Sequence, residues 1–243
     1  MASLMGKKIV VVGGSSGIGL GVAAAALARG AELVIIGRSQ DKLLRAQQAL
    51  GDDGRVRTVT ADMMREAEIA AAFAGAGAFD HLVSTAGTPP PGDPIGETDV
   101  ENVRRFIDNK LIGTVLLAKQ AMKTLRVGGS MTFTSGINKD RPPVPGGAVV
   151  SAIAGSFSYL ARALSLELAP TRVNVVSPGW VDTPMFDELV GDAKAGYFES
   201  MAARLPIGRI AKPVDVAPAY LYAMESDFTT GETIHIDGGQ RLI

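Results

Sequence analysis

The sequence contains no cysteine, only two histidines and few aromatic residues. Without cysteine among its 243 residues, the chain can form neither disulfides nor thiolate metal sites, and it has no cysteine nucleophile; this fits a reducing compartment. The two histidines, His81 and His235, cannot build a zinc site by themselves. Aromatic residues make up 5% of the chain, whereas glycine occurs 29 times. Such a composition favours close packing of backbone against backbone and is typical of proteins that hold flat, phosphorylated ligands.

The chain also lacks an excess of charge and a long hydrophobic run. Its 24 basic and 25 acidic side chains give a net charge of −1, so we expect no nucleic-acid partner. The run Ile9–Val12 is too short for a signal peptide. The stretch Leu20–Ala28 contains Gly21 and is far shorter than the roughly 20 residues that a membrane span needs. We therefore expect a cytoplasmic protein without a membrane partner.

Short apolar runs alternate with longer helical patterns along the whole chain. Continuous apolar runs of this length are typical of strands buried on both faces, and their alternation with helices indicates a parallel sheet. The sequence predicts one α/β domain over residues 1–243, a doubly wound parallel sheet of about seven strands with helices on both faces. The predicted strands are Ile9–Val12, Leu33–Ile36, Val56–Thr60, His81–Ser84, Met131–Thr134, Val173–Val176 and Thr233–Ile236, and the clearest helices are Gly19–Arg29, Asp41–Leu50 and Val150–Leu168.

A glycine-rich loop joins the first predicted strand to an alanine-rich helix. Glycines allow the sharp turn and let backbone N–H groups approach a phosphate at the positive end of the helix. The alternative is a tight turn that only allows close packing of helix and sheet. The strand before the loop and the helix after it favour phosphate binding. The candidate residues are Gly13, Ser15, Ser16, Gly17, Ile18 and Gly19.

Two segments rich in proline and glycine, Thr88–Gly96 and Arg141–Gly147, follow predicted strands. Ligand-binding loops of parallel sheets lie at these places. A linker is the weaker alternative, because neither segment separates parts that could fold alone.

With this set of motifs the chain resembles the short-chain dehydrogenase/reductase family. Its glycine signature, Thr-Gly-x-x-x-Gly-x-Gly, is matched by Val12–Gly19 with valine in place of threonine. The resemblance extends from about Met5 to Gln240 and implies a Rossmann-like fold, a nicotinamide cofactor and hydride transfer. The other matching residues are Asp62, Ala86-Gly87, Arg172-Val173-Asn174, Pro178-Gly179, Thr183, Gly208-Arg209, Pro213, Asp215-Val216-Ala217 and Asp237-Gly238-Gly239.

The end of the second predicted strand predicts which nicotinamide cofactor is used. An acidic residue there would bind the ribose 2′-hydroxyl of NAD and repel the 2′-phosphate of NADP. The strand ends instead on Arg38 and Ser39, which can hold a 2′-phosphate through charge-assisted hydrogen bonds. We therefore expect NADP(H). The alternative is that Arg38 is a solvated loop charge.

The resemblance also implies contacts along the rest of the cofactor. Asp62 and its neighbour Met63 would lie at the adenine, although Asp62 could instead cap a helix over Met63–Ala72. The family's Asn-Asn-Ala-Gly segment along the adenosine ribose is Ser84-Thr85-Ala86-Gly87 here, with both asparagines replaced. The remaining contacts, to the nicotinamide amide and the pyrophosphate, are implied for Pro178, Gly179 and Thr183.

The resemblance fails at the family's catalytic pair, a tyrosine and a lysine one helical turn apart. The segment Arg162–Pro170 matches the end of the family's helix without gaps and places Val150 at the tyrosine position and Ala154 at the lysine position. Neither side chain can exchange a proton. Tyr159 would face the opposite side of the helix, where we expect it to pack. The chain is thus similar to a divergent member that lacks the Tyr-x-x-x-Lys pair.

Two residues are candidates for the missing chemistry. Lys110 stands where the family has the asparagine that holds a relay water, and we hypothesise that it supplies the lost cation by binding the cofactor ribose or protonating the substrate oxygen. The alternative is a surface lysine on an amphipathic helix. Ser135 is the candidate for the substrate-orienting serine, although an ungapped count places Gly136 there.

The segment 183–212 is similar to the family's substrate lid. Its apolar residues indicate an apolar or aromatic carbonyl or alcohol substrate, or an interface. The resemblance also implies a homotetramer or homodimer, with Ile234–Ile243 at an interface. The apolar lid residues are Met185, Phe186, Leu189, Tyr197, Phe198 and Met201.

Three functions remain open on the sequence. The leading one is an NADP(H)-dependent oxidoreductase that acts on a carbonyl or alcohol with a non-standard proton donor. The second is a catalytically inactive NADP(H)-binding sensor or partner-stabilising protein, because the binding motifs stand beside an altered proton relay. The third is an isomerase or lyase that uses the same cavity.

Overall fold

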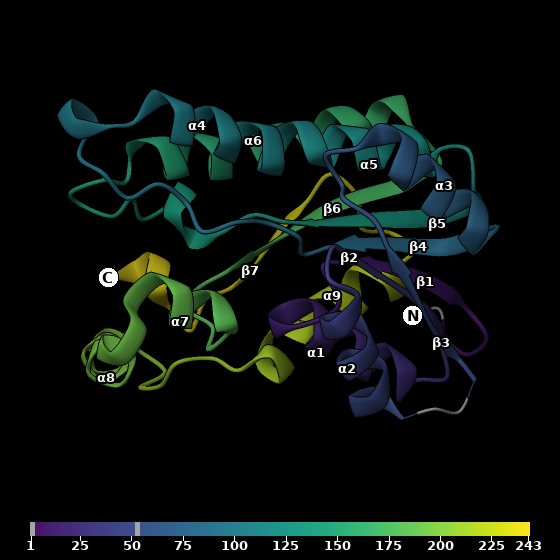
Figure 1. Ribbon diagram of the computed structural model, residues 1–243, viewed down its shortest axis with the longest axis horizontal. Coiled ribbons are helices and arrows are strands. Elements are labelled where there is room, and N and C mark those ends of the chain that lie inside the picture. The colour runs from purple at the N-terminus through teal and green to yellow at the C-terminus, as the bar shows by residue number, and fades with distance from the viewer. Residues whose placement is uncertain (1–2, 52–53) are drawn as a thin grey trace.

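The protein is a three-layer α/β structure built on one parallel sheet (Figure 1). The computed structural model describes residues 3–51 and 54–243. The seven strands follow the order β3-β2-β1-β4-β5-β6-β7, and all neighbouring pairs are parallel. The predicted doubly wound sheet is confirmed. The strands are β1 (Lys8–Val12), β2 (Glu32–Gly37), β3 (Val56–Thr60), β4 (Phe79–Ser84), β5 (Leu125–Thr134), β6 (Arg172–Pro178) and β7 (Thr233–Ile236).

Helices cover both faces of the sheet. In Figure 1, α1, α2 and α9 lie on one side of the strands and α3, α4, α5 and α6 on the other. The helices are α1 (Gly17–Leu27), α2 (Gln40–Leu50), α3 (Glu66–Ala76), α4 (Val100–Ile107), α5 (Gly113–Ala121), α6 (Ala148–Glu167), α7 (Pro184–Val190), α8 (Lys194–Arg204) and α9 (Pro213–Glu225).

Strand β1 shows why the sheet needs both helical layers. Because alternate side chains of a strand point to opposite faces, Ile9 and Val11 join the hydrophobic cluster of α1 and α9. Val10 and Val12 join the cluster formed with α3, α5 and α6. All four side chains are buried. A continuous apolar run is therefore required here, as the sequence predicted.

Several elements begin at residues other than those predicted. Strands β4 and β5 start earlier, at Phe79 and Leu125, and pair there across an irregularity in register. Helix α3 begins at Glu66 rather than Met63, because the preceding residues form a turn in which the Asp62 carboxylate accepts the N–H of Met64. The alternative that Asp62 caps a helix from Met63 is therefore wrong, because Asp62 closes a turn before the helix.

A π-helical turn, Asp108–Ile112, joins α4 to α5 without a break in the helical rod. The hydroxyl of Thr114 donates to the carbonyl of Lys110 at 2.7 Å. An inserted wide turn of this kind re-aims the side chains that it carries and is often found at functional sites. Asn109 and Lys110 both lie on this turn.

Helix α6 is long and apolar enough to cross a membrane when only length and composition are considered. Core helices of globular folds meet the same test, and α6 lies along the sheet beside α5 (Figure 1). Its residues Phe157 and Ala161 belong to the core cluster on that face. The apolar character of α6 is therefore accounted for in part by packing on the sheet.

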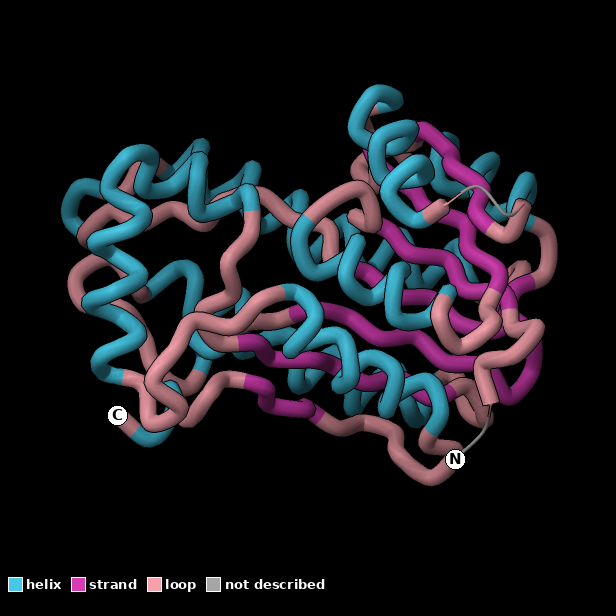
Figure 2. Tube along the Cα trace, turned by 90° about the horizontal axis from the view of Figure 1, so that it is seen from below, coloured by secondary structure: helices cyan, strands magenta, loops and turns pink. Residues whose placement is uncertain are grey.

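Helices α7 and α8 form a projection at one end of the sheet. Figures 1 and 2 place them near the C-terminus and away from the N-terminus. Neither helix contains a buried residue. This projection, the predicted lid, is therefore attached to the core rather than built into it.

Candidate active site

A groove of about 610 Å³ lies where the carboxyl ends of β1, β2 and β4 meet the starts of α1 and α7. Its position follows from the strand order, since the connection after β1 leads to β2 on one side of the sheet centre and the connection after β4 leads to β5 on the other. Ligands of open parallel sheets bind at such a switch point. The predicted site residues that line the groove are Gly13, Ser15, Ser16, Gly17, Ile18, Arg38, Ser39, Met63, Ala86, Gly87 and Thr183.

The glycine loop brings backbone close to backbone at the floor of the groove. Gly13 has a φ of +83°, and a Cβ there would lie 2.6 Å from the backbone nitrogen of Ala86. Gly17 starts α1 with a φ of +52°. Among the described residues, no side chain caps the first turn of α1. The N–H groups of that turn are therefore available to an anion in the groove.

Basic side chains gather where β2 ends. Arg38 and Ser39 line the groove, and the hydroxyl of Ser39 accepts the backbone N–H of Lys42. Lys42 also lines the groove and was missed from the sequence, since a lysine on the first turn of α2 carries no motif of its own. The acidic residue of the lining, Glu188, comes from α7 at another wall.

Five predicted cofactor-binding residues lie outside the lining of the groove, namely Gly19, Asp62, Ser84, Pro178 and Gly179, and the two catalytic candidates, Lys110 and Ser135, line neither this groove nor a second cavity described below. Ser84 is buried and its carbonyl accepts the hydroxyl of Thr134. Gly179 packs closely on Asp237, where a Cβ would lie 2.8 Å from the Cα. In the part of the chain that the structure describes, these residues have packing and hydrogen-bonding roles.

Asn109 is a groove residue that the sequence did not indicate. It lines the groove from the π-helical turn and is buried. Within residues 3–51 and 54–243, its side-chain Oδ1 has no hydrogen-bond partner. A buried acceptor without a partner is costly in free energy, so this oxygen is suited to a donor on a ligand.

Lys110 points into the protein beneath Gly87. Its Nζ donates to the carbonyl of Thr134 at 3.2 Å and lies 5.4 Å from the centre of the Phe157 ring. Gly87 leaves room for it, because a Cβ at that position would lie 3.2 Å from Nζ. Among the described residues, no carboxylate forms an ion pair with it. Desolvation of the ammonium group lowers the pKa of Lys110 to about 8. The alternative of a solvated surface lysine is wrong.

Ser135 and Lys110 approach the same part of α6. The Ser135 hydroxyl donates to the carbonyl of Ala154 at 2.7 Å, and Phe157 lies one turn further along the helix. Val150 and Ala154, the positions that the family resemblance assigns to tyrosine and lysine, are both buried. Lys110 therefore brings a cation to a region of α6 that carries only apolar side chains at those two positions.

Tyr159 points away from this region, as predicted, but it does not pack. Its side chain is 73% exposed, and the guanidinium of Arg162 lies 5.6 Å from its ring centre. The prediction of a packing residue is wrong because no element covers this face of α6 within the described chain.

Motif residues beyond the groove hold the fold together. The guanidinium of Arg172 donates to the carbonyls of Ala223 and Met224 at the end of α9. Asn174 binds the backbone of the loop before β7 through both atoms of its amide. Asp215 forms a bidentate ion pair with Arg209.

No group of three or more metal-binding side chains occurs among the described residues.

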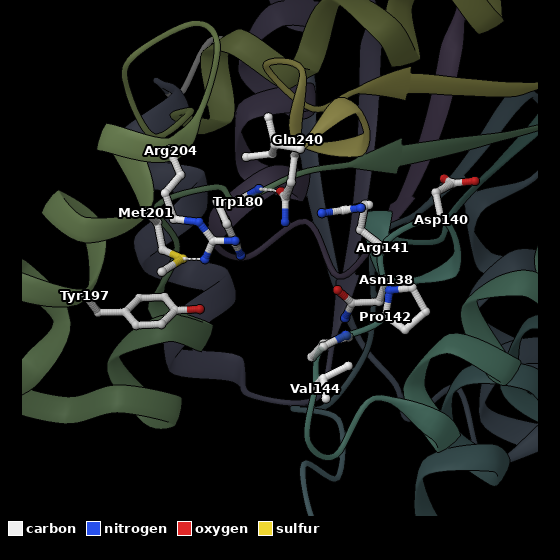
Figure 3. Close-up of a pocket in the computed structure, with 12 residues that line it drawn as sticks. Asn138, Asp140, Arg141, Pro142, Val144, Trp180, Tyr197, Met201, Arg204 and Gln240 are labelled. Carbon is white, nitrogen blue, oxygen red and sulfur yellow. Dashed lines mark hydrogen bonds between the residues drawn. The ribbon is translucent and has the colours of Figure 1, made fainter.

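A second pocket of about 590 Å³ opens between the loop after β5 and α8 (Figure 3). Trp180, which follows β6, lines this pocket, and Thr183 on the same segment lines the groove. Residues of one short segment, 180–183, therefore line both cavities. The residues that line the pocket are Asn138, Asp140, Arg141, Pro142, Pro143, Val144, Trp180, Tyr197, Met201, Arg204, Gln240 and Ile243.

The apolar residues of the projection divide between two roles. Phe186 and Phe198 stack edge to face with ring centres 5.1 Å apart, and Tyr197 lies 6.1 Å from Phe186. Tyr197 and Met201 line the second pocket, whereas Met185 lines the groove. Part of the apolar content that indicated a substrate therefore serves to hold α7 on α8.

Comparison with known proteins agrees with this geometry. The family model described as enoyl-(acyl carrier protein) reductase matches residues 12–241. The chain is 32% identical to the short-chain dehydrogenase/reductase malC of Malbranchea aurantiaca, over 98% of this chain and 96% of that protein. It is 35% identical to cis-4-hydroxycyclohexanecarboxylate dehydrogenase of Sinomonas cyclohexanicum, over 96% of each.

Solved structures share the same fold over nearly the whole chain. The structure of the MalC reductase/Diels-Alderase from the same fungus has a TM-score of 0.89 and 31% identity, with 99% of this chain and 98% of that chain covered. A small-chain dehydrogenase in complex with NADPH has a TM-score of 0.81 and 31% identity, with 98% of this chain and all of that chain (100%) covered. The chain therefore belongs to the short-chain dehydrogenase/reductase family of oxidoreductases.

Proposed function

We propose that this protein is an NADP(H)-dependent oxidoreductase that transfers hydride to or from a carbonyl or alcohol carbon, with Lys110 as its proton donor. The observation that carries the proposal is the placement of Lys110. A desolvated lysine without an acidic partner lies beneath the floor of the groove, beside the α6 positions where the family resemblance expects the catalytic pair.

The groove suits a dinucleotide that carries an additional phosphate. Backbone N–H groups from the start of α1 would hold the pyrophosphate, and the unpartnered Oδ1 of Asn109 would accept a ligand hydroxyl or amide. Arg38, Ser39 and Lys42 would hold the 2′-phosphate. A relative whose structure contains NADPH is in keeping with this choice. The bound nicotinamide would supply the hydride.

Lys110 would supply the proton that the substrate oxygen needs when hydride reaches the carbonyl carbon. A pKa of about 8 leaves the ammonium both populated and acidic enough to donate near neutral pH. Its present acceptor, the carbonyl of Thr134, is neutral and holds the ammonium more weakly than a carboxylate would. Ser135 would turn its hydroxyl from the carbonyl of Ala154 to the substrate oxygen and orient it.

We infer a small-molecule substrate with an apolar body, which Trp180, Val144 and Met201 of the second pocket would contact. We also infer a homodimer or homotetramer. Exposed apolar side chains on α6, such as Leu166, and at the C-terminal segment, such as Leu242, support association.

A second candidate function is NADP(H) binding without turnover, as in a redox sensor or a subunit that stabilises a partner. The observation that favours it is the apolar, buried pair Val150 and Ala154 on α6. The two functions differ in one respect that can be measured, which is whether bound NADPH is oxidised by any carbonyl compound.

The test begins with NADPH binding by fluorescence, followed by NADPH oxidation with a panel of ketones, quinones and aldehydes. We expect Lys110→Met to lower kcat by about 10²- to 10⁴-fold and to change the Kd for NADPH little. Lys119→Met, on the exposed side of α5, is the matched control and should keep full turnover. Because reduction requires the charged lysine, kcat should fall as the pH rises through about 8.

Three outcomes separate the proposals. Full turnover by Lys110→Met, or an unchanged pH profile in that variant, would remove Lys110 from the chemistry. Tight NADPH binding with no oxidation by any compound would favour the second candidate. Equal affinity for NADH and NADPH would overturn the assigned cofactor.

A further inference from the structure

The second pocket contains two arginines that the proposed function does not use. Arg141 comes from the loop after β5 and Arg204 from the end of α8. Figure 3 shows their guanidinium groups extending from opposite walls into the same space. Both residues are exposed in this open pocket, so a ligand entering from solvent meets them directly.

Neither arginine is neutralised by the protein. In residues 3–51 and 54–243, no carboxylate forms an ion pair with Arg141 or Arg204, and the guanidinium of Arg204 lies 3.9 Å from the sulfur of Met201. By contrast, Arg209 on the next loop forms two hydrogen bonds of 2.7 Å with Asp215. The positive charge of the two pocket arginines is therefore available to a ligand.

The acidic residue of the pocket lining has partners of its own. The carboxylate of Asp140 accepts from Lys139 at 2.8 Å and from the ring of His235 at 3.0 Å. In Figure 3 it points away from the space between the two arginines. These neighbours offset the charge of Asp140, whereas the side chains of Arg141 and Arg204 have no ion-pair partner among the described residues.

The other polar groups of the pocket supply hydrogen-bond donors. The Oε1 of Gln240 accepts the backbone N–H of Trp180 at 3.1 Å, which leaves the amide nitrogen facing the pocket (Figure 3). Burial raises the pKa of Tyr197, so its hydroxyl stays protonated. Val144 and Met201 add apolar contact surface between these donors.

We propose that the substrate of this enzyme is an organic acid whose carboxylate is bound by Arg141 and Arg204. The inference rests on the proposed function for the reacting end of the molecule, because Trp180 of the pocket and Thr183 of the groove lie on the same short segment after β6. A guanidinium fork matches a planar carboxylate, and the apolar walls suit a hydrocarbon body. The carbonyl or hydroxyl would then lie at the groove end and the carboxylate at the α8 end.

The test uses one pair of probes, para-acetylbenzoate and its neutral methyl ester, with the full-length protein. Binding is measured by calorimetry with the protein saturated with NADP⁺ and again without cofactor. We expect the acid to bind about ten-fold tighter than the ester or better, as for a charge-assisted contact. Raised salt should reduce the difference.

Arginine variants connect this preference to the pocket. Arg141→Gln and Arg204→Gln should each remove most of the preference for the acid. Arg57→Gln is the matched control, because Arg57 lies on β3 at the far edge of the sheet and donates to the carbonyl of Gly75. It should keep the full preference.

Every outcome decides the proposal. Equal binding of acid and ester, no binding of the acid at millimolar concentration, or a preference that survives both pocket variants would overturn it. NADPH binding and oxidation are measured separately. If the protein neither binds nor oxidises NADPH but still prefers the acid through the two arginines, the proposed oxidoreductase is wrong. The anion site is then still supported.

Discussion

The groove and the second pocket are both lined by residues of the segment 180–183, but they are built in different ways. The groove lies on strand ends and helix starts, where backbone approaches backbone so closely that Gly13 has no room for a Cβ. The pocket is lined by side chains from a loop, from α8 and from the C-terminal segment. Helices α7 and α8 contain no buried residue. Backbone geometry thus shapes the groove, whereas long, exposed side chains determine what the pocket can bind.

The largest expected effect comes from removing the close approach of backbone in the groove. Gly13→Ala places a methyl group against the backbone of Ala86 at a φ of +83°. We expect loss of NADPH binding by more than about 100-fold, together with a lower Tm. Fluorescence titration and thermal unfolding measure the two effects.

The matched control is Gly128→Ala. Its φ of +79° carries the same backbone penalty, but nothing lies within 4 Å of a Cβ there. A residue in the left-handed region costs about 1–2 kcal/mol of folding free energy, with no effect on the groove. If both variants bind NADPH alike, close backbone approach does not shape the groove.

A smaller effect is expected from the side-chain part of the groove. Arg38→Asp replaces the cation proposed to hold the 2′-phosphate with a carboxylate that would repel this phosphate and can accept from a 2′-hydroxyl. NADPH affinity should fall about 10- to 100-fold and NADH affinity should rise. Arg45→Asp makes the same charge change on α2 outside the groove and should leave the preference unchanged. An unaltered preference in Arg38→Asp would remove that residue from cofactor selection.

The smallest effect is expected in the projection. Lys194 binds Asp182 and Asp187 at 2.7 Å each and lies 5.4 Å from the centre of the Phe198 ring. Because these groups are exposed, Lys194→Met should loosen α7 and α8 only about two- to five-fold, measured as faster amide hydrogen exchange. Exchange in β1 and α1 should not change. Equal acceleration in both regions would contradict the independence of the projection from the core.

The sequence predicted the sheet and the glycine loop because both depend on local rules. Strand β1 must be apolar on both faces, and the loop must turn sharply before α1. The sequence could not predict the π-helical turn, because the turn continues the helix and changes only the directions in which the side chains of Asn109 and Lys110 point. Lys42 and Arg204 carry no motif, and their places in the two cavities depend on how α2 and α8 dock.

Lys110 could be predicted from the sequence only in part. Its alignment with the family's asparagine suggested that it reaches the cavity; its side chain lies against Gly87, which lines the groove, but Lys110 itself is not part of the lining. Its catalytic role stays a prediction. Tyr159 shows the opposite case, because helical spacing predicted its direction but not whether another element covers it.

The order of the strands has a consequence for how the chain acquires its site. Gly13 directly follows β1, yet its neighbour Ala86 follows β4, and a Cβ at Gly17 would lie 3.2 Å from Thr183, which follows β6. The backbone of Trp180 is held by Gln240, close to the last residue. During synthesis, the glycine loop emerges long before the segments that pack against it. A chain interrupted before β7 therefore lacks Gln240, and with it one wall of the second pocket and the hydrogen bond that holds Trp180.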